Sequence, residues 1–164
     1  MKSIAHTRPF VIGVDTHAAN HVYSILTPTG QIEDTQQFPT TGKGIQRAIN
    51  WVGRRTGGDM DALWVIEGCS SYGAILAGTL DAMTYTVCEA PFMSPKNRHG
   101  KGKDDQSDSI RIAQGVLALK ETELRQPRLD QGIRPALQVL TTAREETAKD
   151  RTRCVNALTA LLRR

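Results

Sequence analysis

The order of its short apolar runs constrains the fold of this chain more than any other feature. Residues 10–14, Phe-Val-Ile-Gly-Val, are apolar and rich in β-branched side chains, which predicts a buried strand that ends at Asp15. Residues 21–26 and 31–38 predict a second and a third strand, which pair as a hairpin across the turn at residues 28–30. Three consecutive strands therefore open the chain.

Helices and strands then alternate. Thr40 or Thr41 can cap a helix that runs to about Arg55 and carries apolar residues at helical spacing. The elements expected after it are a strand at 63–66, a helix at 72–83 and a strand at 84–89. This order predicts an α/β fold with a mixed five-stranded sheet and flanking helices, and it matches the order of ribonuclease H-like proteins.

The remaining sequence predicts three segments. A helix is expected from about Asp104 to Leu119, so that residues 1–120 form the ribonuclease H-like domain. Residues 121–130 are polar and predict a linker, and residues 131–164 predict one long helix. Spacings of three and four residues give this helix a heptad-like seam with a polar middle. Because no Gly, Asn or Pro ends it, we expect the helix to continue in a longer parent protein as a coiled-coil or interdomain region.

Composition and charge narrow the class of protein. With 39% hydrophobic and 23% charged residues, the chain is too apolar to be disordered. A net charge of +4 is a mild hint of a polyanionic partner. Three cysteines far apart, without CxxC spacing, argue against zinc and disulfides and predict buried reduced thiols. No run approaches the ~20 apolar residues of a membrane span, and the N-terminus lacks a secretory signal, so we expect a cytoplasmic protein.

Four acids are candidates for a metal site. Asp15 and Glu67 each follow an apolar strand, and ligands gather at the carboxyl ends of strands in α/β sheets. Asp105 and Asp108, three residues apart at a helix start, share one helix face. Converging carboxylates repel one another, and a hard dication such as Mg²⁺, or Mn²⁺ in its place, relieves the repulsion. Each acid alone has a commoner explanation as a turn or helix-terminal residue, so the prediction depends on their combination.

Residues near these acids suggest further roles. The loop at 94–103 contains no acid and carries four cations suited to a phosphate backbone, which are Lys96, Arg98, Lys101 and Lys103. His17 and His21 could act as ligands or acid-base groups, although histidines at a surface turn are commoner. Ser70, Ser71 and Tyr72 could contact a substrate or cap the following helix.

Three motifs resemble the DEDD transposases of the insertion sequence 110 family. The first is Gly-Val-Asp-Thr-His at residues 13–17, followed by His21 and Val22. The second is Glu-Gly at residues 67–68 with Ser-Tyr-Gly at 71–73, and the third is Gly-Lys-Asp-Asp-Gln-Ser-Asp at 102–108. The final helix is also similar, so the resemblance covers nearly the whole chain. Two residues depart from the family pattern: Asp104 stands where Ser or Thr is usual, and Ser109 where Ala is usual.

The resemblance implies a fold, a cofactor and partners. The four acids Asp15, Glu67, Asp105 and Asp108 would bind Mg²⁺ in a RuvC-like N-terminal domain that cleaves and exchanges DNA strands. A C-terminal domain would supply a nucleophilic serine, so this fragment alone could be inactive in recombination. The implied partners are the DNA of the element ends and target, a guide RNA, and further copies of the chain that assemble through the C-terminal helix. The protein would associate with the nucleoid when it acts.

Other interpretations of the same residues stay open. A stand-alone RuvC-like nuclease that resolves Holliday junctions would cleave with the metal site alone. A non-catalytic nucleic-acid-binding or dimerisation module would tolerate Asp15→Asn or Asp105→Asn without a change in metal binding. An actin-like phosphotransferase would explain Gly-Val-Asp-Thr at residues 13–16, but it needs a second phosphate-binding half that 164 residues cannot supply.

Overall fold

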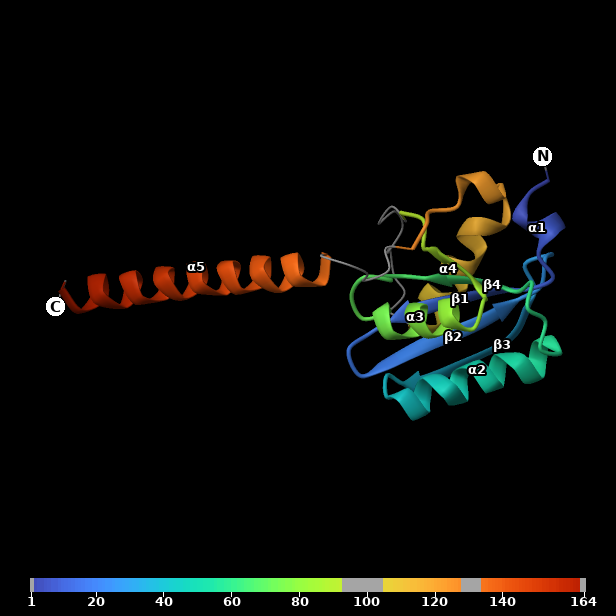
Figure 1. Ribbon diagram of the computed structural model, residues 1–164, viewed down its shortest axis with the longest axis horizontal. Coiled ribbons are helices and arrows are strands. Elements are labelled where there is room, and N and C mark those ends of the chain that lie inside the picture. The colour runs from blue at the N-terminus through green and yellow to red at the C-terminus, as the bar shows by residue number, and fades with distance from the viewer. Residues whose placement is uncertain (1, 93–104, 128–133, 163–164) are drawn as a thin grey trace. The chain divides into compact units, whose positions relative to one another are not determined.

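The five strands form one mixed sheet in the order β3-β2-β1-β4-β5 (Figure 1). The computed structural model describes residues 2–92, 105–127 and 134–162, without the side chains of residues 105–107, 134, 135 and 138. The strands are β1 (Val11–Thr16), β2 (Asn20–Leu26), β3 (Ile32–Pro39), β4 (Leu63–Ile66) and β5 (Thr86–Glu89). The first three are antiparallel neighbours, and β4 and β5 run parallel to β1. The predicted mixed five-stranded sheet is confirmed.

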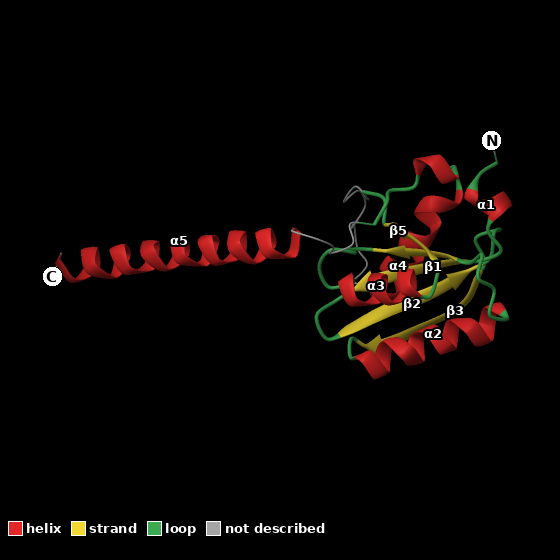
Figure 2. Cartoon of the chain, viewed as in Figure 1, coloured by secondary structure: helices red, strands yellow, loops and turns green. Residues whose placement is uncertain are grey.

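Helices cover both faces of the sheet (Figure 2). On one face lie α2 (Gly42–Thr56) and α3 (Ala74–Ala82), and on the other lie α1 (Ile4–Thr7) and α4 (Asp105–Leu117). The predicted cap of α2 is confirmed at Thr41, whose hydroxyl accepts a hydrogen bond from the Gly44 amide at 3.1 Å. The helix ends at Gly57, which adopts a left-handed φ of +65° that glycine tolerates.

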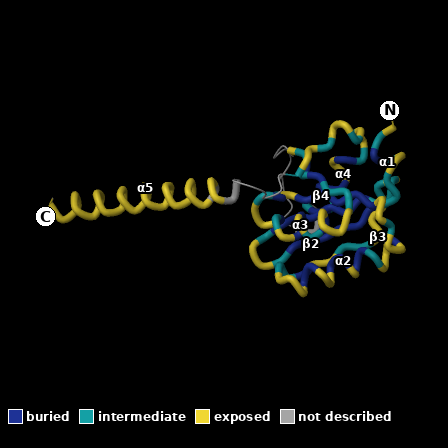
Figure 3. Tube along the Cα trace, in the orientation of Figure 1, coloured by how far each residue is buried: buried dark blue, intermediate teal, exposed yellow. Residues whose placement is uncertain are grey.

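Buried residues concentrate in the central strands of the sheet (Figure 3). Alternation along the strands divides their side chains between two cores. The core under α2 and α3 contains large rings, including Tyr23 and Trp64. The core under α1 and α4 contains smaller aliphatic groups, including Val11 and Val65. The same alternation decides which strand-end residues face α4.

Residues 119–127 attach to the sheet rather than leaving it. The short helix η1 (Glu121–Glu123) lies at the start of the predicted linker, and the Arg8 guanidinium donates to the Glu121 carboxylate at 2.7 Å. The Glu89 amide donates to the Arg125 carbonyl at 2.9 Å, which adds a bridge to the edge strand β5. The first compact unit accordingly runs from Met1 to Leu129. It also contains the short helix α1, which the sequence pattern did not predict.

The second compact unit comprises Asp130–Arg164 and contains α5 (Arg134–Leu162). All the α5 side chains that the structure describes are exposed. They include large apolar groups at the predicted seam positions, which are Leu137, Leu140, Leu158 and Leu161. Ion pairs between residues three apart, Glu146 with Lys149 and Asp150 with Arg153, lie along the helix. None of the helices in the described parts of the chain is long and apolar enough to cross a membrane.

Candidate functional site

Asp15 lies near the end of the central strand β1 and is only 4% exposed. Strand alternation puts it on the same face as Val11 and Gly13, which pack against the α1–α4 side. One of its carboxylate oxygens lies 3.1 Å from Nε2 of His17. Asp15 is therefore a buried carboxylate that faces α4 and is contacted by a histidine.

Glu67 follows β4 directly beside Asp15. Val14 pairs with Ile66, and the Glu67 amide donates to the Val14 carbonyl at 3.1 Å, which continues the parallel pairing by one residue. Alternate residues of a strand line one face of the sheet, so Glu67 lies on the same face as Leu63 and Val65. Both of these residues pack on the α4 side. The two predicted strand-end acids thus lie on adjacent strands and on one face.

The electrostatics of Glu67 link it to the helical acid. Although the residue is exposed at the surface, partial burial of its carboxyl raises the pKa, and the negative charges of Asp15, Asp108 and Glu89 raise it further. His17 acts in the opposite direction and lowers the pKa. Asp15 and Asp108 therefore both lie close enough to Glu67 to influence its carboxyl group.

A close helix–strand contact determines where Asp108 lies. A Cβ atom on Gly13 would come within 2.1 Å of the Ser109 carbonyl oxygen, so only glycine lets α4 approach β1 this closely. The hydroxyls of Ser24 and Ser109 hydrogen-bond at 2.7 Å within the buried interface. Asp108 directly precedes Ser109 in the first turn of α4, and Arg111 donates to its carboxylate at 3.3 Å. Ser109, a departure from the family pattern, therefore has a specific partner on β2.

The other predicted site residues are not described at the level of side chains. Asp105 is the first residue of α4, but its side chain lies outside the described residues. Lys96, Arg98, Lys101 and Lys103 also lie outside them. Among the described residues, no group of three or more His, Cys, Asp or Glu side chains is arranged to hold a metal ion.

The donor set nevertheless fits a hard dication. Carboxylate oxygens are the ligands that Mg²⁺ and Mn²⁺ favour, and a cation would offset the repulsion that raises the Glu67 pKa. Asp15, Glu67 and Asp108 supply described carboxylates in this region, and Asp105 starts the same helix as Asp108.

The structure corrects two sequence interpretations. His21 is not a surface-turn histidine: it lies in β2, is 1% exposed, and its Nδ1 accepts a hydrogen bond from the His17 amide at 3.3 Å. Burial lowers the pKa of His21, which keeps it neutral near pH 7. Of the cysteines, Cys69 and Cys88 are buried as expected, but Cys154 is exposed on α5.

Glu89 is a site residue that the sequence interpretation missed. Its carboxylate accepts hydrogen bonds from the amides of Gly68 and Cys69, at 2.8 and 3.1 Å. The sequence carried a sign of this role, because Glu89 is an acid at the end of a predicted strand, as Asp15 and Glu67 are.

Comparison with known families assigns the chain. The family model described as a transposase, that of the IS110 DEDD transposases, matches residues 12–164. The chain belongs to this family. Comparison with curated proteins gave no match. The matched range includes the strands, α4 and α5, so the resemblance seen in the three sequence motifs is confirmed over nearly the whole transposase chain.

Membership of the family has consequences for function. A transposase acts on DNA, and DEDD transposases in general use divalent metal for phosphodiester chemistry.

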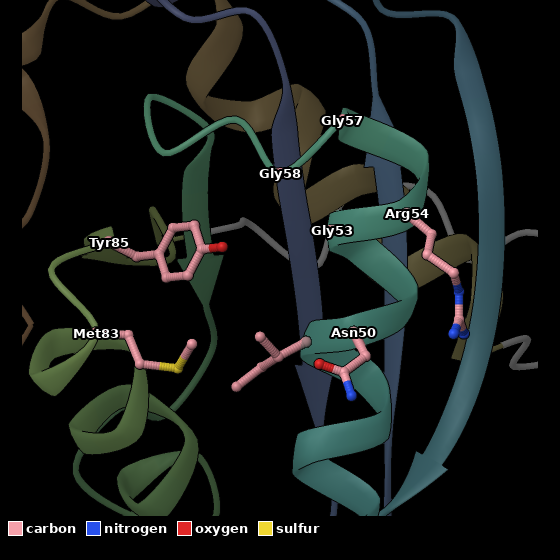
Figure 4. Close-up of a pocket in the computed structure, with 8 residues that line it drawn as sticks. Asn50, Gly53, Arg54, Gly57, Gly58, Met83 and Tyr85 are labelled. Carbon is pink, nitrogen blue, oxygen red and sulfur yellow. The ribbon is translucent and has the colours of Figure 1, made fainter.

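A groove elsewhere on the transposase holds none of the predicted site residues (Figure 4). It lies between α2 and the region where α3 leads into β5, and has a volume of about 500 Å³. The residues that line it are Ile49, Asn50, Gly53, Arg54, Gly57, Gly58, Met83 and Tyr85. It belongs to the face of the sheet opposite α4, so it is separate from the acids.

Proposed function

We propose that this chain is the N-terminal RuvC-like domain of the transposase and binds Mg²⁺ through Asp15, Glu67, Asp105 and Asp108 for DNA strand cleavage and exchange. One observation carries the proposal: Asp15 and Glu67 lie at the ends of the adjacent parallel strands β1 and β4 and face α4, the helix that carries Asp108. A cluster of this kind is costly without a cation and favourable with one.

Asp15 and Glu67 would have different roles at the site. Asp15 is buried and contacted by His17, so it would provide a fixed ligand at the base of the site. Glu67 is more exposed and would provide a second carboxylate ligand. A bound dication would stabilise the charge that develops on phosphate oxygens during strand cleavage. Completion of strand exchange would use the serine that the family resemblance assigns to a C-terminal domain.

Metal titration tests the proposal. We expect Mn²⁺ and Mg²⁺ to bind the chain in calorimetry, and Asp15→Asn or Asp105→Asn to abolish the binding because each removes a ligand charge. Asp81→Asn is the matched control: Asp81 is an exposed aspartate on α3, and its variant should bind as the unmodified chain does. Equal binding by the Asp15 and Asp81 variants would rule out the metal site.

Nucleic-acid binding is proposed for the basic segment. Lys96, Arg98, Lys101 and Lys103 would contact the phosphate backbone of the element ends and target, or of a guide RNA, at the nucleoid in the cytoplasm. Affinity for branched DNA should fall as salt rises, and replacement of Lys101 and Lys103 by Gln should reduce the slope of that dependence. A slope that does not change would remove these lysines from the interface.

Self-association is proposed for α5. Its exposed leucines recur at the spacing of a coiled-coil seam, and burying them against a second copy would remove apolar surface from water. Sedimentation should therefore give a dimer that Leu140→Glu converts to a monomer, whereas Lys149→Glu, away from the seam positions, should leave it intact. A monomeric unmodified chain at high concentration would contradict this assignment.

A further inference from the structure

The backbone around Glu67 is held by side chains from two other strands. Thr16, at the end of β1, donates its hydroxyl to the Glu67 carbonyl at 2.7 Å. Glu89, at the end of β5, accepts from the amides of Gly68 and Cys69 with separate carboxylate oxygens, at 2.8 and 3.1 Å. We name Thr16 and Glu89 together the Glu67 clamp.

The turn after Glu67 is a place where such support matters. Strand pairing fixes the Glu67 amide through its bond to Val14, but β4 ends at Ile66 and the chain then turns sharply. Gly68 adopts a left-handed φ of +70°, and the Gly73 amide closes the turn by donating to the Gly68 carbonyl at 3.0 Å. The clamp holds the two peptide groups that follow Glu67, those joining Glu67 to Gly68 and Gly68 to Cys69.

Glu89 is an unexpected residue for this position. Its negative charge lies near Glu67 and, after burial and the charges of Asp15 and Asp108, is a further cause of the raised pKa of Glu67, so the residue is electrostatically unfavourable there. Its charge-assisted hydrogen bonds to two backbone amides offset that cost. A neutral side chain could not accept both bonds in the same way.

Glu89 is placed to support Glu67 rather than to join it as a ligand. Because successive side chains of a strand point to opposite faces, Glu89 lies on the same face as Val87, which packs against the α2–α3 core. Asp15 and Glu67 lie on the opposite face, toward α4. Both Glu89 oxygens are also engaged by amides. The carboxylate therefore acts on the backbone of the turn and reaches the site only through Glu67.

We infer that Thr16 and Glu89 are positioning residues, which orient Glu67 toward Asp15 and Asp108 by fixing the peptide groups that follow it. The inference rests on the proposed role of Glu67 as a metal ligand. Replacement of residues that support a metal ligand typically lowers metal affinity about 10- to 100-fold.

The first test needs no metal. Amide hydrogen exchange followed by NMR should show protected Gly68 and Cys69 amides in the unmodified chain, and Glu89→Gln should lose protection at both, about tenfold or more. The Glu67 amide bonds to Val14 and should stay protected, which reports that the sheet is intact. Unchanged protection at Gly68 and Cys69 would overturn the clamp, whether or not the chain binds metal.

The second test measures Mn²⁺ affinity by calorimetry. Glu89→Gln and Thr16→Val should each weaken binding, by about tenfold and by a few-fold respectively. Thr16→Val is decisive, because it removes a hydrogen bond without changing charge. Matched controls are Glu33→Gln, an exposed glutamate on β3, and Thr79→Val on α3, and both should bind normally. Normal Mn²⁺ binding by Thr16→Val would contradict the inference.

A double-mutant cycle separates positioning from simple charge loss. If Glu89 acts through Glu67, then Glu89→Gln should have little further effect on Mn²⁺ affinity in a Glu67→Gln background. A through-space charge effect would persist at full size in that background and would overturn the positioning role. If the unmodified chain does not bind Mn²⁺, the proposed function is refuted instead. The hydrogen-exchange test would still show whether Glu89 holds the Gly68 and Cys69 amides.

Discussion

The two faces of the sheet are built on different physical principles. Under α2 and α3, large rings meet edge to face, with the centroids of Tyr23 and Phe38 5.7 Å apart and those of Tyr23 and Trp64 6.4 Å apart. Under α4, the contact depends on the missing side chain of Gly13 and on a buried pair of serine hydroxyls. The first face buries much apolar area, whereas the second brings a helix close to a strand. The difference indicates that one face supplies stability and the other supplies the geometry of the acids.

A cavity under α3 should lower stability without affecting the acids. Leu80 is fully buried there, and Leu80→Ala should lower the free energy of unfolding by about 3 kcal/mol, measured by urea denaturation. The Mn²⁺ affinity of the folded chain should stay unchanged. Ile75→Ala, an exposed position on the same helix, should cost no more than ~0.5 kcal/mol. A matching loss of Mn²⁺ affinity in Leu80→Ala would break the division between the faces.

A methyl group between β1 and α4 should affect both stability and the site. Gly13→Ala would place Cβ against the Ser109 carbonyl and force α4 away, which should cost about 2 kcal/mol of unfolding free energy. Because α4 carries Asp108, Mn²⁺ affinity should also fall, about fivefold or more. Gly53→Ala in α2 has open space around the new methyl group and should be stabilising by ~0.5 kcal/mol or more. Unaltered Mn²⁺ affinity in Gly13→Ala would show that the close approach is not needed.

The buried serine pair should contribute a smaller amount. Ser109→Ala restores the residue usual in the family but leaves the Ser24 hydroxyl without this partner, and should cost about 1 kcal/mol in urea denaturation. The combined Ser24→Ala and Ser109→Ala variant should cost less than the sum of the two single variants, because the second change removes no further bond between them. Strictly additive costs would mean that the two hydroxyls act independently.

The pH dependence of stability should show the smallest effect. Because the folded state raises the Glu67 pKa above its ordinary value of 4.5, the folded state binds the proton more tightly, and stability falls as pH rises through that window. With a chelator present to remove metal, the Glu67→Gln variant should therefore be more stable than the unmodified chain at pH 7, by ~0.5 kcal/mol or less once solvent screening is included. The difference in unfolding free energy should disappear below about pH 4, where Glu67 is protonated in both states. A variant that is less stable at pH 7 would contradict this sign.

Local patterns predicted most of the elements correctly. The apolar run before Asp15 and the cap at Thr41 act through neighbouring residues, so their outcome could be inferred from spacing and residue type. The helix α1 was missed because it is a single turn whose Ile4 is buried by residues far along the chain. Residues 121–125 were predicted as linker because the partners that hold them, Arg8 and Glu89, lie elsewhere in the sequence.

Residue type and order by themselves determined that this chain forms a mixed sheet with acids at the ends of two strands and at the start of a helix, because strand alternation and helix capping are local. Only the tertiary structure decided that Asp15 and Glu67 face α4 together, that His21 is buried, and that Glu89 supports the turn beside Glu67. These features depend on which strands become neighbours and how closely α4 approaches Gly13, and such long-range contacts leave no periodic signal in the sequence.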